Sequence, residues 1–288
     1  MNRGTGAPII FLILMIGVSM SVFLNPPLYM MIIMLTLYVT FFFGFSFTHG
    51  FQTIGGKAIS VLFGVTALVT YVMEWLGTHY GIPFGHYYYT NQLGPLILDV
   101  PVVIPVQWFN VLYVCYLMTN IILTRSDDSV DEAEISNFSL MVPRMIVTSV
   151  ITGLFMVSWD LINDPYMVGL GSWVWTDPTE FLGLSLDGIP LSNFLGWFLT
   201  SVLTVLLFDL YRYKARMPIQ STSEKVTDTM NGLVLVPYLY LFIFQTTHGI
   251  AAGVLSFGSL PVWLAMVTMG LAIIVTGWRY SQHRGKGG

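Results

Sequence analysis

Three carboxyl groups lie within or just beyond long apolar segments of this chain, where an ionised side chain is costly. Glu74 stands in the sequence YVMEWLG and Asp160 in VSWDLIND, with Asp164 one helical turn further along. The nearest basic residues are far away in the sequence, and burial without a cation disfavours the charged form of a carboxyl group. We therefore expect Glu74 or Asp160 to be protonated at neutral pH and to act as a general acid. The structural alternative is a pair of neutral carboxyl groups that hydrogen-bond helices together.

Aromatic residues gather in the loops that follow these acids, residues 78–99 and 163–189, which contain no Lys or Arg. They alternate at Tyr87, Tyr89, Trp173 and Trp175. Alternation predicts short extended segments or hairpins and not helices. Aromatic residues at this depth fit either a belt at the membrane interface or the wall of a pocket. If they form a pocket, we expect Trp75, Trp159 and Asn193 to contribute to the same wall.

Acids beside aromatic faces suit acid chemistry on a hydrocarbon. Protonation of a trisubstituted alkene gives a tertiary carbocation, and each aromatic face stabilises such a cation by ~0.5–2 kcal/mol. In this hypothesis Glu74 or Asp160 donates the proton. The other acid, together with Asp164, His79 or Asn193, positions the water that captures the cation.

Other kinds of site are poorly supported. The spacing of the five histidines matches no zinc pattern, and the single cysteine, Cys115, excludes an internal disulfide and a cysteine-built metal site. The chain contains no phosphate-binding loop, dinucleotide fingerprint or GxSxG motif, so we expect neither metal nor cofactor. Asp160 and Asp164 form a DxxxD pair that can hold magnesium diphosphate, but basic residues for the diphosphate are missing on their side. A retinal Schiff base is excluded because no lysine lies in a helix core.

The elements that must position these residues are membrane helices. Of 288 residues, 55% are hydrophobic and 9% are charged, whereas soluble domains carry about a quarter charged residues. Apolar runs near twenty residues long favour an all-α bundle in one transmembrane domain covering 1–288. Pro165 predicts that the helix carrying Asp160 ends there. We expect eight spans, at about 8–24, 28–47, 58–77, 100–124, 144–162, 190–211, 232–252 and 259–278.

The basic residues predict the orientation of these spans. With eight crossings and a cytoplasmic N-terminus, all eleven Lys and Arg residues fall on the cytoplasmic side, as the positive-inside rule requires. Both termini are then cytoplasmic, and residues 125–143 and 212–231 form cytoplasmic linkers. The protein is expected to be a multi-pass protein of the cell membrane, in contact with lipid and with no role in nucleic-acid binding.

Two segments of the chain also resemble each other. An offset of 86 residues places Glu74 on Asp160 and Tyr87 on Trp173, and with a few inserted residues Trp108 falls on Trp197. This pattern predicts a parallel internal repeat of a two-helix unit, at about 58–124 and 144–211. Such a repeat would place Glu74 and Asp160 at the same depth, facing a shared cavity.

Four stretches carry a likeness to a known family. EWLGTHYGIPFGHYYYTNQLGP, VPVVIPVQWF, WDLINDPYMVGLGSWVW and GIPLSNFLGWFLT resemble the integral-membrane carotenoid biosynthesis proteins of the CruF type. These are carotenoid 1,2-hydratases, a group that includes the archaeal bisanhydrobacterioruberin hydratases. The resemblance covers about residues 60–210 closely. It implies cofactor-independent addition of water to the terminal double bond of an acyclic end group.

The sequence is therefore interpreted as a hydratase, a carbon–oxygen lyase, for a long polyene such as lycopene or a bacterioruberin precursor. Other enzymes of the carotenoid pathway are possible partners. One alternative is an isomerising carotenoid cyclase, which uses the same protonation but excludes water. Another is a non-enzymatic carotenoid-binding or proton-coupled membrane protein, which would return the polyene unchanged.

Overall fold

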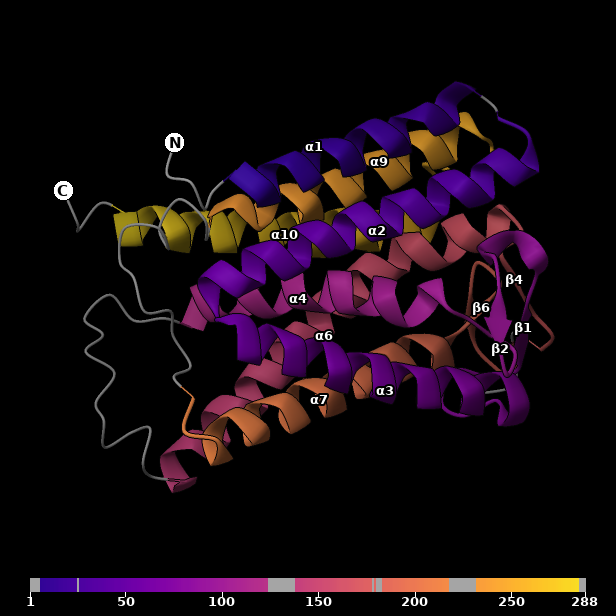
Figure 1. Cartoon of the computed structure of the whole chain (residues 1–288). Coiled ribbons are helices and arrows are strands. Elements are labelled where there is room, and N and C mark those ends of the chain that lie inside the picture. Colours follow the sequence, from indigo (N-terminus) through magenta and orange to yellow (C-terminus); the bar gives the residue numbers. More distant parts are fainter. Residues whose placement is uncertain are drawn as a thin grey trace.

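The computed structural model describes residues 6–24, 26–123, 138–177, 179, 183–217 and 232–284. This part of the chain folds as an all-α bundle of eight long helices, which run alternately up and down (Figure 1). A short 3₁₀ helix, η1, extends the first helix over Ser21–Leu24. The long helices are α1 (Gly6–Met20), α2 (Leu28–Thr53), α3 (Gly56–Tyr80), α4 (Val103–Leu123), α6 (Phe138–Gly169), α7 (Leu191–Lys214), α9 (Leu235–Ala251) and α10 (Leu260–Arg284).

Seven segments of the described chain are long and apolar enough to cross a membrane. The eighth helix, α9, has 17 residues, packs against α10, α6 and α4, and is hydrogen-bonded to Ser19 of α1 through Tyr240. A helix of that length is close to the ~17–25 residues that a bilayer core requires. The chain is therefore a multi-pass membrane protein, and the eight helices correspond to the eight predicted runs.

One predicted helix boundary is wrong. The helix that carries Asp160 does not end at Pro165 but continues through it to Gly169, and it also begins before Pro143. Proline removes its own N–H donor and crowds the carbonyl group one turn earlier, and a membrane helix packed against neighbouring helices tolerates both effects. As a result Asp160 and Asp164 belong to one continuous helix and lie one turn apart on it.

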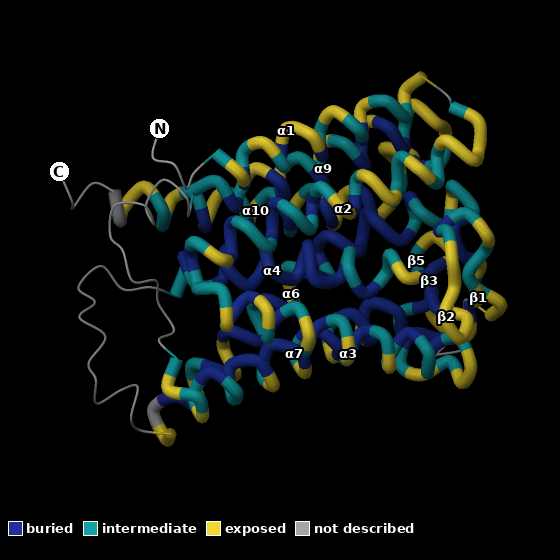
Figure 2. Tube along the Cα trace, in the orientation of Figure 1, coloured by how far each residue is buried: buried dark blue, intermediate teal, exposed yellow. Residues whose placement is uncertain are grey.

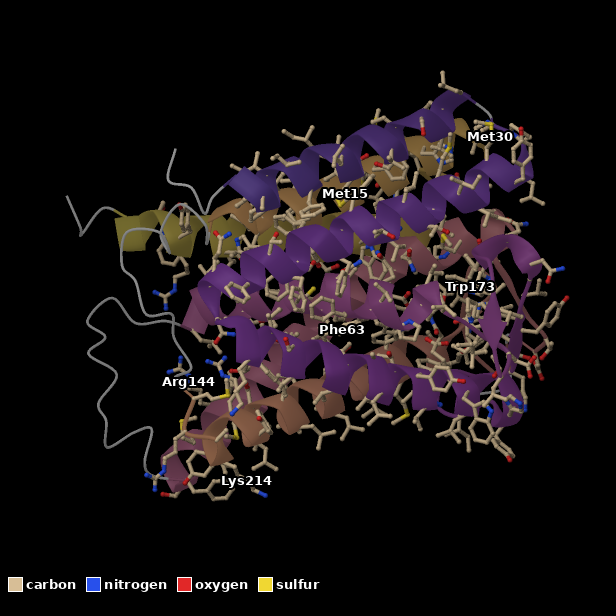
Figure 3. The ribbon with its side chains drawn as sticks, in the orientation of Figure 1. Met15, Met30, Phe63, Arg144, Trp173 and Lys214 are labelled. Carbon is tan, nitrogen blue, oxygen red and sulfur yellow. The ribbon has the colours of Figure 1, made fainter. Side chains whose placement is uncertain are left out.

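Helix α6 begins at Phe138 and α7 continues to Lys214, so both helices overlap the predicted linkers 125–143 and 212–231. Residues 124–137 and 218–231 lie outside the described residues. Basic side chains such as Arg144 and Lys214 occur at the end of the bundle away from the strands (Figure 3). We propose that this end is cytoplasmic, as the positive-inside rule predicts.

The predicted extended segments are present at the other end of the bundle. β1 (Tyr87–Tyr89) and β4 (Trp173–Trp175) pair as an antiparallel ribbon, with Tyr88 opposite Val174. Two hairpins complete this end, and the short 3₁₀ helix η2 (Asn91–Leu93) precedes the first. The hairpins are formed by β2 (Leu96–Ile97) with β3 (Val100–Pro101) and by β5 (Ser185–Leu186) with β6 (Ile189–Pro190).

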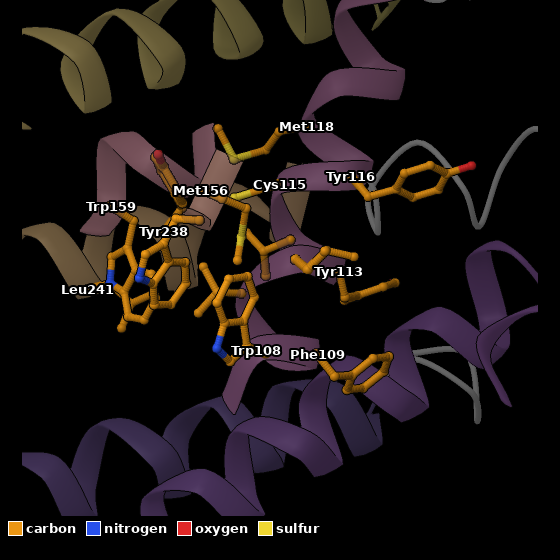
Figure 4. Packing of buried hydrophobic residues seen from close by; sticks show 14 of the residues in the cluster. Trp108, Phe109, Tyr113, Cys115, Tyr116, Met118, Met156, Trp159, Tyr238 and Leu241 are labelled. Atoms are coloured by element: carbon orange, nitrogen blue, oxygen red, sulfur yellow. The ribbon is translucent and has the colours of Figure 1, made fainter. Parts of the chain in front are cut away.

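The centre of the bundle is α4, which is buried along nearly its whole length, whereas α1, α2 and α10 show one exposed face (Figure 2). Helices α2, α3, α6, α9 and α10 all contact α4. Figure 4 shows its buried Trp108 on the side of Trp159 of α6 and Tyr238 of α9. Phe109 lies away from them, and its ring contacts Phe43 of α2 at 5.6 Å and Phe63 of α3 at 5.1 Å. A helix that is apolar on all sides occupies such a central position.

The two predicted repeat segments contact each other in a reciprocal way. Helix α3 packs on α4 and on α7, while α6 packs on α7 and on α4. The strands β1 and β4 pair about their central residues, and Pro101 and Pro190 occupy the same position in the two hairpins. These are the contacts that a local two-fold axis between the segments would produce. On this basis we propose that 58–124 and 144–211 are related by such an axis, near the membrane normal.

Candidate functional site

Glu74 is held by three hydrogen-bond donors at the strand-bearing end of α3. Its Oε2 accepts the hydroxyl groups of Tyr87 and Tyr89, the latter at 2.6 Å. Its Oε1 accepts the indole N–H of Trp108 at 2.9 Å. The side chain is only 4% exposed, and no cation takes part in these contacts. The carboxyl group is thus paired through neutral donors, as a buried polar group must be.

Asp164, in the predicted repeat segment 144–211, is hydrogen-bonded in a comparable way by residues of the same segment. Its Oδ1 accepts the indole N–H groups of Trp173 at 3.0 Å and Trp175 at 3.3 Å. Its Oδ2 accepts the side-chain amide of Asn193 at 2.5 Å. The same amide donates to Oδ2 of Asp160 at 2.9 Å. Asn193 therefore bridges two buried carboxyl groups that lie one turn apart on α6.

The β1–β4 ribbon explains how one element serves both acids. Alternate residues of a strand point to opposite faces, so Tyr87 and Tyr89 face the bundle while Tyr88 is exposed. The register places Tyr87 opposite Trp175 and Tyr89 opposite Trp173. Their rings contact each other, with centroids 4.9 Å apart in the first pair. The inner face of the ribbon thus presents hydroxyl groups to Glu74 and indole groups to Asp164.

A glycine lets the ribbon approach α3 closely. A Cβ atom at Gly77, one turn after Glu74, would lie 2.9 Å from ring atoms of both Phe84 and Tyr87. Such a distance is too short for a carbon–carbon contact, so any larger residue would push the tyrosine away from the acid. The motif EWLG therefore supplies an acid and, three residues later, the space for its donor.

A cavity of about 190 Å³ lies beneath the ribbon. Its wall is mainly apolar and aromatic, and the residues that line it include no Lys, Arg or His. Eight of the predicted site residues line it, namely Glu74, Tyr87, Tyr89, Trp159, Asp164, Trp173, Trp175 and Asn193. Concave apolar cavities with a few converging polar groups are the usual form of a small-molecule site.

Three predicted site residues do not line this cavity. Asp160 is fully buried behind the bridging amide of Asn193. The ring of Trp75 contacts that of His79 in a tilted arrangement, with centroids 4.7 Å apart. Nε2 of His79 lies 3.5 Å from the exposed carboxyl group of Asp99. His79 is itself part of α3, and its Nδ1–H donates to the backbone oxygen of Trp75, one turn earlier, at 2.9 Å.

Several cavity residues were not predicted. Trp108 and Trp197 stack on each other, and Trp159 meets Trp197 edge-on at 5.5 Å. Gln245 of α9 accepts the indole N–H of Trp159 and donates to Asn163, at 2.9 and 2.8 Å. The first pair could have been predicted, because Trp108 and Trp197 occupy matching places in the predicted repeat. Nothing in the sequence around Gln245 distinguishes it from other polar residues of membrane helices.

The electrostatic character of the site is set by acids and neutral donors. Among the described residues no group of three or more His, Cys, Asp or Glu side chains could hold a metal ion. The polar atoms of the cavity are carboxyl, amide, hydroxyl and indole groups. This arrangement can donate a proton, hold a carboxylate and orient a small polar molecule against an apolar wall.

Comparisons with known proteins identify the family. A curated relative, the bisanhydrobacterioruberin hydratase of Haloarcula japonica, is 31% identical over 143 residues. That match covers 49% of this chain and 42% of the relative, so the chain matches less than half of the relative's length. No solved structure matches the chain. The carotenoid biosynthesis protein family matches residues 27–272, and the chain belongs to that family.

Proposed function

We propose that this protein adds water across the terminal double bond of an acyclic carotenoid end group. The observation that carries the proposal is the cavity itself, in which Glu74 and Asp164 face an aromatic wall with no basic side chain. Membership of the carotenoid biosynthesis family supports a carotenoid as substrate. The name of the relative from Haloarcula japonica supports hydration as the reaction.

Glu74 is the proton donor in this proposal. Two of its three partners are tyrosine hydroxyl groups, which can either donate or accept a hydrogen bond. A protonated Glu74 can therefore turn its O–H toward Tyr87 or Tyr89, or toward the substrate, and stay hydrogen-bonded. The acid and its conjugate base are both accommodated, as a group that releases and regains a proton requires.

Asp164 is the anionic partner. Its contacts come from two indole N–H groups and one amide N–H, and these groups can only donate. Donors alone match an ionised carboxylate, because a proton on either oxygen would compete with them. An anion at this place stabilises a developing carbocation, together with the faces of Trp173 and Trp175.

The chemical steps balance without a cofactor. The O–H of Glu74 gives its proton to the less substituted carbon of the terminal C=C bond, whose π electrons form the new C–H bond. The other carbon becomes a tertiary cation, and the oxygen of a water molecule forms a C–O bond to it. One proton of that water passes to the Glu74 carboxylate, which restores the acid. Asn163 and Asn193, both at the cavity wall, are suited to orient this water.

Expression in a lycopene-producing host tests the reaction. We expect extracted pigments to gain the mass of one water molecule for each modified end, and the Glu74→Gln variant to return lycopene unchanged. A product of unchanged mass with a ring would favour the isomerising cyclase. Unmodified lycopene that nevertheless co-purifies with the wild-type protein would favour a carotenoid-binding protein and contradict the proposal.

A further inference from the structure

The cavity beneath the ribbon continues away from the acids as an apolar arm. We use this term for the part lined by one face of α1 and η1, one face of α2, and α9. Its side chains recur at helical spacing, so each helix contributes a single stripe. The stripes are represented by Val18, Val22, Leu28, Met31, Leu35 and Phe244.

Exposure along α2 shows where the arm opens. Val39, at the inner end, is 4% exposed, Met31 and Leu35 are half-buried, and Leu28 is 54% exposed. All four residues line the same cavity. Eleven residues separate Leu28 from Val39, which corresponds to ~16 Å along a helix. The arm is thus a passage of roughly that length, which is enclosed by protein near the acids and open to the surroundings at Leu28.

The surface around this opening is apolar. Phe23, Leu24 and Tyr29, in and beside the turn between η1 and α2, are all exposed. On a membrane helix such side chains face lipid. The polar group nearest to the arm on α1, Ser19, is already bonded to Tyr240 at 2.5 Å and to the backbone oxygen of Met15 at 2.9 Å. A hydrocarbon beside Ser19 therefore leaves that hydroxyl group hydrogen-bonded.

We infer that the apolar arm binds the hydrocarbon chain of a linear polyene, which enters from the lipid at Leu28 and brings its end group to the acids. This inference rests on the proposed function for the identity of the ligand. Continuity of the arm with the acid cavity supports it, because one lining connects Leu28 to Glu74. Methionine side chains such as Met31 and Met34 adapt to a long flexible or curved ligand.

The length of the arm limits how much of the substrate the protein can hold. At ~16 Å it is about half of the ~30 Å hydrocarbon core of a bilayer. A carotenoid about as long as the bilayer core must then leave its far half outside the protein, in lipid. The protein consequently holds one end at a time, and both ends of a symmetric polyene are reached only by release and rebinding.

Bulky substitutions in and beside the arm test the inference. Met31→Trp and Leu35→Trp place a large ring in the passage. Met30→Trp and Ile33→Trp are matched controls, because these neighbours on α2 are exposed and do not line the cavity. Each protein is purified from lycopene-producing cells, and bound lycopene, counted together with any hydrated product, is measured by its visible absorption per protein. Thermal unfolding in detergent checks that each variant is folded.

We expect the two arm variants to retain tenfold less lycopene than the wild type and the two controls to retain about as much. Wild-type lycopene content in both arm variants would overturn the inference, and so would an equal loss in the controls. An arm variant that unfolds early is replaced by Met31→Phe, for which the same loss is expected. Because the measurement is binding, it is independent of hydration. A wild-type protein that binds lycopene through the arm but never hydrates it would defeat the proposed function alone.

Discussion

The indole rings of Trp108 and Trp197 stack almost parallel, with centroids 3.7 Å apart and planes 11° from each other. These two residues occupy matching places in the predicted repeat, on α4 and α7. Only Trp108 donates its N–H to Glu74, at 2.9 Å. An aromatic pair of this kind contributes about 0.5–1.5 kcal/mol beyond the area that it buries. The stack therefore fixes a donor of the candidate acid from the opposite segment.

The variant Trp108→Phe separates the stacking of this residue on Trp197 from its hydrogen bond to Glu74. The variant keeps a ring for stacking but leaves Oε1 of Glu74 without its indole donor. We expect hydration to fall about tenfold, since a hydrogen bond to a carboxylate is worth roughly 1.5–3 kcal/mol. Trp197→Phe is the control, because all three donors of Glu74 remain. Product formation per protein is measured by mass spectrometry, and equal rates in the two variants would contradict the role of the Trp108 donor.

Amide substitutions distinguish the roles of Glu74, Asp160 and Asp164. Glu74→Gln keeps the shape of the side chain but cannot donate the proton, so we expect hydration to fall by ~10²–10⁴-fold. Asp164→Asn removes the anion and should cost less, while Asp160→Asn, away from the cavity, should cost least. Bound lycopene, again counted together with any hydrated product and measured by absorption, should stay near the wild-type amount in all three. A Glu74→Gln protein that hydrates at the wild-type rate would show that this acid is structural.

An engineered disulfide tests whether β1 and β4 pair in the observed register. Tyr88 and Val174 are opposite each other in the β1–β4 register, and both point outward. Residues directly opposite have Cβ atoms ~4.5–5.5 Å apart, within reach of a disulfide after small adjustment. In a Cys115→Ser background, we expect Tyr88→Cys with Val174→Cys to form a disulfide on mild oxidation, seen as a gel shift. The control pair, Tyr88→Cys with Ser185→Cys, should not, and similar yields would mean that β1 and β4 do not pair in the membrane.

Single cysteines test the orientation. The positive-inside rule places the strand-bearing end outside the cell and the ends of α7 and α10 in the cytoplasm. In the same Cys115→Ser background, Asp177→Cys should react with a membrane-impermeant maleimide in intact cells. Lys214→Cys should react only after permeabilisation, because both positions are exposed in the fold but lie at opposite ends of it. The reverse pattern of labelling would invert the proposed topology.

The sequence predicted the helices and the strands well for physical reasons. Long apolar runs have one solution in a bilayer, and the alternating aromatics of β1 and β4 cannot form one face of a helix. The error at Pro165 arose because a local rule for proline ignores the packing around α6, which keeps the helix intact. Helix ends are decided by such tertiary contacts more than by residue type.

The candidate site was less predictable. Asp160 and Asp164 lie one turn apart on nearly the same face of α6, so their positions along the helix axis decide which of them reaches the cavity. Those positions depend on how α6 packs against α4, α7 and α9, information that no single segment contains. Trp75 follows Glu74 directly and so lies about 100° around α3, away from the acid. Its position was foreseeable from helix geometry, whereas the contribution of Gln245 was not.

The pairing of one strand from each segment has a consequence for loop length. Residues alternate between the two faces of a strand, so a shift of β1 by a single residue would turn Tyr87 and Tyr89 outward and Tyr88 inward. Glu74 would lose two donors, and the partners of Trp173 and Trp175 would change in the same event. Insertion or deletion of one residue between Gly81 and Tyr87 is thus equivalent to several substitutions at once. The number of residues in this short loop therefore decides which side chains of β1 face the acids.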